Sequence, residues 1–184
     1  MEYFFLILST LDSTLRVATP LILCAMAGIF SERSGIIDIG LEGKMLASAF
    51  AAGAMAFVSG SAWIGLLAGI SISMLASLIH AFACVTHRGD QVISGLAINI
   101  LASGLTVVLG IAFFRQGGQT PHLSNSGRFM SIDFPFSESI SKFPLLGPIY
   151  SDLIGGHNLL VYLAFLSVPL TYYIIYKTRF GLRL

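Results

Sequence analysis

Three long stretches of the sequence contain no aspartate, glutamate, lysine or arginine. They run from Met45 to His87, from Gln91 to Phe114 and from Leu153 to Tyr176. A helix rises about 1.5 Å per residue, so about 20 apolar residues cross a hydrocarbon core of about 30 Å. Each stretch can span a membrane, and the first is long enough to span it twice. The sequence therefore predicts an all-α fold, a polytopic membrane helix bundle.

The composition also indicates a membrane protein. Of the 184 residues, 55% are hydrophobic and 10% are charged, whereas about a quarter are charged in a typical soluble domain. A net charge of +1 lacks the basic face that nucleic-acid binding needs, so we expect no nucleic acid as a partner. Cys24 and Cys84 lie in apolar runs without CxxC spacing or a clustered histidine. We expect membrane-buried thiols rather than a disulfide, redox pair or metal site.

Five spans fit the pattern, in a single transmembrane domain over residues 1–184. Met1 to Leu11 is too short to cross comfortably, and Asp12 and Ser13 separate it from the first span. An interfacial position suits this segment. Residues 115–156 are rich in Gly, Pro and Ser and predict an extramembrane loop. The expected spans are Thr14–Phe30, Leu41–Val58, Ala62–Thr86, Gln91–Phe114 and His157–Tyr176.

Basic residues in the short loops predict the orientation. The loop HRGD after the third span and the tail KTRFGLRL carry the clearest basic bias, which places both in the cytoplasm. Residues 115–156 then form an extracytoplasmic loop. If residues 32–44 are a simple connection, the N-terminus lies outside. If part of this stretch re-enters the membrane, the N-terminus lies on the opposite side.

Small residues repeat every four positions in two of the spans. In lipid such ridges let helices approach closely. His80 follows the ridge of the third span, and we expect it to have a packing or interface role. The ridge positions are Ser48, Ala52, Ala56 and Gly60 in the second span, and Gly65, Gly69, Ser73 and Ser77 in the third.

The fourth span carries a polar stripe. Its Asn99 lies about 12 Å beyond Gln91 at helical rise, well within the hydrocarbon. An interhelical hydrogen bond is one role for this amide, and a polar patch along a substrate path is the other. The stripe consists of Gly95, Asn99, Ser103, Thr106 and Gly110.

The stretch FSERSGIIDIGLEGKM, residues 30–45, concentrates charge in a chain that otherwise avoids it. Gly35, Gly40 and Gly43 weaken any continuous helix and predict a broken element. Transporters place such breaks near their pathways, where protein or a water-filled cavity satisfies the backbone. The alternative is an ordinary cytoplasmic loop with an N-terminal helix cap.

No catalytic motif accompanies this stretch. The sequence has no Ser, His and Asp set with nucleophile spacing, no P-loop, no HExxH and no glycine-rich dinucleotide turn. We therefore expect no enzymatic activity, no cofactor and no metal site in this chain.

A longer motif resembles a known family. The segment TPLILCAMAGIFSERSGIIDIGLEGKMLASAFAA, Thr19 to Ala52, resembles permease subunits of bacterial ABC importers in the branched-chain amino acid and simple sugar permease superfamily. It is most similar to the nucleoside and simple-sugar branch, where ERSG, two apolar residues, Asn or Asp, and IGLEG follow the first span. Three further segments agree in order: RGDQVISGLAINILASGLT from Arg88, PLLGPIYSDLIGGHNLLVYLAFLSVP from Pro144 and TRFGLRL from Thr178.

The resemblance implies one permease subunit of an importer in the bacterial cytoplasmic (inner) membrane. Its implied partners are a second permease subunit, two cytoplasmic ATP-binding subunits and an extracytoplasmic substrate-binding protein. ATP hydrolysis on the partners would switch the permease pair between inward-facing and outward-facing states. The implied substrate is a nucleoside, with ribose-type sugars second.

The resemblance also assigns residues to roles. Asp38, Glu42 and Asn99 are implied near the translocation path. Glu32 and Arg33, with Gly35, Gly40 and Gly43, are implied to structure the loop, and Thr178, Arg179, Phe180 and Gly181 to lie near the ATPase-coupling region.

Similar permeases continue beyond TRFGLRL with a coupling segment and several more spans. This chain therefore resembles the N-terminal part of a longer permease, with a fragment, a split gene or a truncated gene as the expected reasons. A non-transporting membrane scaffold or channel-like protein that uses the glycine ridges to oligomerise is the alternative of a different class.

Overall fold

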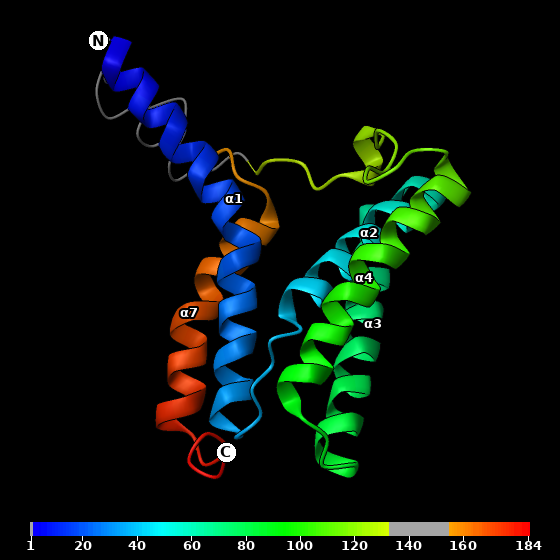
Figure 1. Ribbon diagram of the computed structural model, residues 1–184. Helices are drawn as coiled ribbons and strands as arrows, with labels where there is room; N and C mark the ends of the chain where they lie inside the picture. Colours follow the sequence, from blue (N-terminus) through cyan, green and yellow to red (C-terminus); the bar gives the residue numbers. More distant parts are fainter. Residues whose placement is uncertain (1, 133–154) are drawn as a thin grey trace. The chain divides into compact units, whose positions relative to one another are not determined.

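A computed structural model describes residues 2–132 and 155–184 of the chain, and these are helical almost throughout (Figure 1). Within these described residues five helices are long and apolar enough to cross a membrane, as the sequence predicts. The elements are α1 (Glu2–Arg33), α2 (Leu41–Ser59), α3 (Ala62–Ala81) continued by the π-helical turn η1 (Phe82–Thr86), α4 (Gln91–Phe114), the 3₁₀ turn η2 (Asn125–Gly127) and α7 (Leu159–Lys177).

Three of the expected spans agree with the structure within one residue at each end. α4 has the predicted bounds because Asp90 caps it, accepting hydrogen bonds from the N–H groups of Val92 (2.8 Å) and Ile93 (3.0 Å). α7 begins two residues later than expected, at Leu159, since Asn158 is its cap and accepts from the Val161 N–H at 3.1 Å.

The expectation for the N-terminal segment was wrong. α1 runs without interruption from Glu2 to Arg33, so the predicted break at Asp12 and Ser13 is absent. Asp12 accepts from Arg16 one turn later (3.2 Å), and the Ser13 hydroxyl donates to the Ser9 carbonyl (2.9 Å). The helix thus satisfies its own polar side chains. Its 32 residues span about 48 Å at helical rise, more than one hydrocarbon core needs.

The chain forms two compact units. One consists of Met1–Met26 with Phe129–Leu184, and the other of Ala27–Arg128. In the first unit His157, just before α7, lies 3.5 Å from the Asp12 carboxylate of α1. The predicted loop 115–156 and the segment from Pro144 fall partly or wholly on residues 133–154, outside the described part of the chain.

In the second unit α2 packs on α3 through the two small-residue ridges, which confirms the expectation that the ridges let helices approach closely. A Cβ atom at Gly65 would lie 2.7 Å from the Ala52 carbonyl oxygen and 2.8 Å from the Ala56 Cβ. A Cβ at Gly69 would lie 3.1 Å from the Ser48 carbonyl oxygen. The two backbones therefore approach too closely for any side chain at Gly65. α4 also packs against α2 and α3.

Candidate functional site

The connection between α1 and α2 is a short non-helical segment, residues 34–40. α1 ends in a turn in which the Gly35 N–H donates to the Glu32 carbonyl (3.0 Å) and the Ile36 N–H to the Ser31 carbonyl (3.1 Å). Gly35 has a φ of +81°, which a residue with a Cβ rarely adopts. The sequence prediction of a broken element at the glycines matches this segment.

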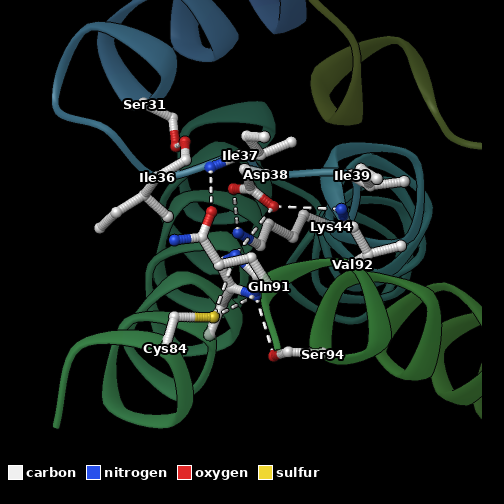
Figure 2. Close-up of polar contacts among 12 residues, drawn as sticks. Ser31, Ile36, Ile37, Asp38, Ile39, Lys44, Cys84, Gln91, Val92 and Ser94 are labelled. Carbon is white, nitrogen blue, oxygen red and sulfur yellow. Dashed lines mark hydrogen bonds and ion pairs between the residues drawn. The ribbon is translucent and has the colours of Figure 1, made fainter. Parts of the chain in front are cut away.

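Side chains of α4 hydrogen-bond to the backbone of the broken segment. Gln91 Oε1 accepts from the Ile37 N–H at 2.7 Å (Figure 2). Asn99 Nδ2 donates to the Ile39 carbonyl at 3.1 Å, and Asn99 Oδ1 accepts from the Gly43 N–H at 2.7 Å. Backbone groups that lie outside a helix and are shielded from water need such partners. Asn99 therefore makes the interhelical hydrogen bond that was one of its two predicted roles.

Asn99 also replaces the cap that α2 lacks. The N-cap residue of α2 is Gly40, which has no side chain to accept from the first helical N–H groups. In an ordinary cap that side chain would bond the third N–H of the helix. Here the acceptor for that N–H, on Gly43, is the Asn99 amide of a different helix. The alternative of an ordinary loop with its own side-chain cap does not describe this helix start.

Glycines let α4 lie against this segment. A Cβ at Gly43 would be 2.7 Å from the Asn99 Cα, and a Cβ at Gly95 would be 2.8 Å from the Gly40 nitrogen. Gly40 and Gly95 thus face each other without side chains between them. This contact brings the Asn99 amide within hydrogen-bonding distance of α2.

Three titratable side chains gather beside this contact. Lys44 Nζ forms an ion pair with Asp38 Oδ2 (Figure 2), and His80 Nε2 lies 3.8 Å from Asp38 Oδ1. Their side chains are only 4%, 9% and 4% exposed for Lys44, Asp38 and His80. His80 Nδ1 lies 3.0 Å from Ser94 Oγ. We call Asp38, Lys44, His80 and Ser94 the ionic cluster.

The ionic cluster contains three residues that were not predicted as site residues, namely Lys44, His80 and Ser94. Lys44 lies inside the expected second span, where a charged side chain needs a partner. Its position in that span was the sequence signal that could have predicted a buried ion pair. His80 lies on the same face of α3 as Gly65 and Gly69, which face α2, so its buried position follows from the ridge. His80 also lies 3.7 Å from the Cys84 sulfur, so the statement that no histidine clusters with the cysteines was wrong.

The remaining predicted loop residues lie at the surface of the described structure. Glu32 and Arg33 are exposed at the end of α1. Glu42 is exposed in the first turn of α2, where a carboxylate interacts favourably with the helix dipole. Within residues 2–132 and 155–184 Glu42 makes no hydrogen bond or ion pair, so its exposed carboxylate is accessible to a ligand or partner.

The residues after α7 form a tight turn. The Thr178 hydroxyl donates to the Ile174 carbonyl at 2.6 Å. Gly181 is buried against α7, where a Cβ would overlap the backbone of Ile175. Arg179 and Phe180 are exposed on this turn.

Residues 10–184 match the family described as branched-chain amino acid transport system / permease component. The chain belongs to this family. The resemblance noted in the motif at residues 19–52 is thereby confirmed, and the chain is a multi-pass protein of the cytoplasmic membrane.

Three curated relatives match almost the whole chain. The guanosine ABC transporter permease protein NupQ of Bacillus subtilis is 38% identical and covers 94% of this chain, which spans 53% of NupQ. The nucleoside ABC transporter permease protein NupC of Lactococcus lactis is 35% identical, over 91% of this chain and 51% of its own length. The putative glucose ABC transporter permease protein TsgC13 of Haloferax volcanii is 30% identical, over 95% and 50%.

The chain spans about half the length of these curated relatives. No solved structure matches it.

Proposed function

We propose that this chain is a membrane-spanning part of an ABC permease that imports nucleosides. The observation that carries the proposal is the similarity to two permeases named for guanosine and for nucleosides, at 38% and 35% identity. A simple sugar is the second candidate substrate, because the putative glucose permease is 30% identical over a similar share of the chain.

The proposed assembly contains a second permease subunit, cytoplasmic ATP-binding subunits and an extracytoplasmic substrate-binding protein. ATP hydrolysis by the partners would shift the permease between outward-facing and inward-facing states through differential binding to the two. In this assembly residues 32–44, the HRGD loop and the C-terminal tail lie in the cytoplasm, and residues 115–156 lie outside.

The broken segment supports a position beside the translocation path. Asn99 of α4 hydrogen-bonds to the backbone here, and Asp38 of the segment forms the ion pair with Lys44. Both residues would therefore set the shape of this part of the path. Glu42, exposed at the start of α2, is the group available to a solute or partner. Glu32, Arg33, Gly35, Gly40 and Gly43 would hold the loop in this conformation.

The turn after α7 supports a contact with the ATP-binding subunits. Thr178 and Gly181 hold the turn against α7, and this leaves Arg179 and Phe180 exposed. A basic and an aromatic side chain on a rigid turn can transmit motion from a docked subunit.

Uptake by the complete importer that contains this chain tests the proposal. The importer is reconstituted in vesicles with its ATP-binding and substrate-binding proteins, and the entry of labelled guanosine, adenosine, ribose and glucose is measured with and without ATP. We expect ATP-dependent entry of the nucleosides, which excess unlabelled ribose does not inhibit. Entry of a sugar alone would overturn the nucleoside assignment, and nucleoside entry that is independent of ATP would overturn the proposed assembly.

A further inference from the structure

A hollow of about 550 Å³ lies inside the second unit, between α2, α4 and the segment that follows α4. Each helix lines it with residues at i, i+3 and i+4, which share one helix face. We call it the α2–α4 hollow. The helical lining residues are Leu46, Ala49 and Phe50 from α2, and Ser103, Thr106 and Val107 from α4.

The hollow lies near the middle of α4. Ser103 and Thr106 are about 18 and 23 Å along the helix from Gln91, and the whole helix is about 36 Å long at 1.5 Å per residue. Hydroxyl groups at this depth are poorly matched to lipid, and polar groups there usually face a bundle interior or a water-filled cavity. Transporters commonly bind their substrates at this depth.

The hydroxyls that line the hollow present acceptor oxygens to it. Ser103 Oγ donates to the Ile100 carbonyl (2.9 Å), and Thr106 Oγ1 donates to the Ala102 carbonyl (2.8 Å). Each donor proton is thus used within α4, while the oxygen retains lone pairs. A solute in the hollow would complement these oxygens with O–H or N–H donors.

The third wall is held in place by two glycine contacts. A Cβ at Gly53 would lie 3.1 Å from Thr120 Oγ1, and a Cβ at Gly110 would lie 2.9 Å from the Gln116 carbonyl oxygen. The segment after α4 therefore folds back onto both helices. It brings Gln119, whose amide can donate and accept, to the edge of the hollow.

One aromatic ring gives the hollow an apolar side. Phe50 lies in the wall, and its ring centroid is 6.4 Å from that of Phe114 in an edge-on contact. Stacking of a base on an aromatic ring is worth roughly 1–3 kcal/mol. A ligand with a flat ring at one end and hydroxyl donors at the other would therefore match both walls, whereas a free sugar would leave the ring unmatched.

We propose that the α2–α4 hollow is a transient nucleoside-binding site, with the base against Phe50 and the ribose hydroxyls donating to Ser103 and Thr106. This inference rests on the proposed function and assigns the substrate class to a named place in the chain. Phe50, Ser103 and Thr106 are then specificity-determining residues for transport.

Transport by the complete importer with three substitutions tests the site. We expect Phe50→Leu to lower the guanosine uptake rate by about tenfold, from the loss of stacking, and Phe50→Tyr to restore most of it. Ser103→Ala should lower guanosine uptake by about threefold, from the loss of one hydrogen bond, and should reduce the preference for guanosine over its 2′- or 3′-deoxy analogues. Ser71→Ala is the matched control, because Ser71 also donates to its own helix (2.8 Å to Leu67) but lies on α3 outside the hollow.

A labelling measurement reports on occupancy directly. Thr106→Cys, in a background with Cys24→Ala and Cys84→Ala, should react with a small thiol reagent, and guanosine should slow that reaction when the complete importer turns over. If the unmodified importer carries guanosine while the three variants match Ser71→Ala and guanosine leaves the labelling unchanged, this inference fails and the proposed function stands. If the importer carries ribose and not guanosine, both fail.

Discussion

The ionic cluster and the α2–α4 hollow are two polar regions of the second unit, and they differ in how their polar atoms are used. In the ionic cluster the side chains of Asp38, Lys44 and His80 contact one another and are almost fully buried. In the hollow the hydroxyls of Ser103 and Thr106 bond only to their own helix and face open space. The first region is a packed structural contact, and the second has room for a solute.

The polar stripe of α4 runs from the contact with the start of α2, beside the ionic cluster, to the hollow. At Gly95 and Asn99 the stripe touches the start of α2, because glycines remove the side chains that would separate the helices. One turn later, at Ser103 and Thr106, the same stripe lines a cavity. A single row of small and polar residues therefore packs against α2 at one end of the helix and lines a cavity further along it. Asn99 itself has the hydrogen-bonding role, and its second predicted role, in a substrate path, stays a prediction.

The largest effect is expected from removing one partner of the buried ion pair. Asp38→Ala would leave the Lys44 charge buried without its carboxylate, which costs about 3–5 kcal/mol. We expect little intact complex after purification and a much lower unfolding temperature in detergent. The double variant Asp38→Leu with Lys44→Met removes both charges and should recover most of the loss.

An exposed ion pair provides the control. Arg16 pairs with Asp12 at 3.2 Å, but its side chain is 58% exposed, and such pairs contribute about 0–1 kcal/mol. Arg16→Ala should therefore leave the yield and unfolding temperature nearly unchanged. Equal stability of Asp38→Ala and Arg16→Ala would contradict a structural role for the ionic cluster.

A smaller effect is expected where the two helices touch. Gly43→Ala would place a methyl group 2.7 Å from the Asn99 Cα, so the helices must move apart, at a cost of about 1–3 kcal/mol. Gly104→Ala is the matched control, because a Cβ there would meet no atom within 4 Å, and alanine favours the helix by about 1 kcal/mol over glycine. Thermal unfolding of the two purified variants should shift in opposite directions. A Gly43→Ala complex as stable as the parent would show that the contact is looser than this geometry.

The sequence predicts the spans well where charge and glycine mark their ends. α4 is bounded by Asp90 and Arg115 and matches its expected limits. The ridges of α2 and α3 were also predictable, because a four-residue repeat of small residues indicates a close helix contact in lipid. Hydropathy and residue spacing are therefore enough to predict both the limits of α4 and the ridges of α2 and α3.

The sequence gives weaker guidance where polar groups find partners that hydropathy does not show. Asp12 and Ser13 suggested a break, but a helix can satisfy them internally through Arg16 and the Ser9 carbonyl. The ionic cluster joins residues from the α1–α2 connection, α2, α3 and α4, so it depends on tertiary packing. The hollow depends on residues 116–120 folding back onto two helices, and that segment has no periodicity from which to predict its path.

The smallest effect on folding is expected at Glu42, the carboxylate in the first turn of α2. Its side chain is exposed at the start of α2, so Glu42→Gln removes only a helix-dipole interaction of about 0.3–1 kcal/mol. The yield and unfolding temperature should be close to those of the parent, in contrast to Asp38→Ala. If Glu42 contributes to the translocation path, guanosine uptake by the assembled importer should still fall severalfold. Glu32→Gln, an exposed carboxylate at the end of α1, is the control that should transport normally. Normal uptake by both variants would leave Glu42 as a stabilising residue of the first turn, and the path would then lie with the hollow rather than with the broken segment.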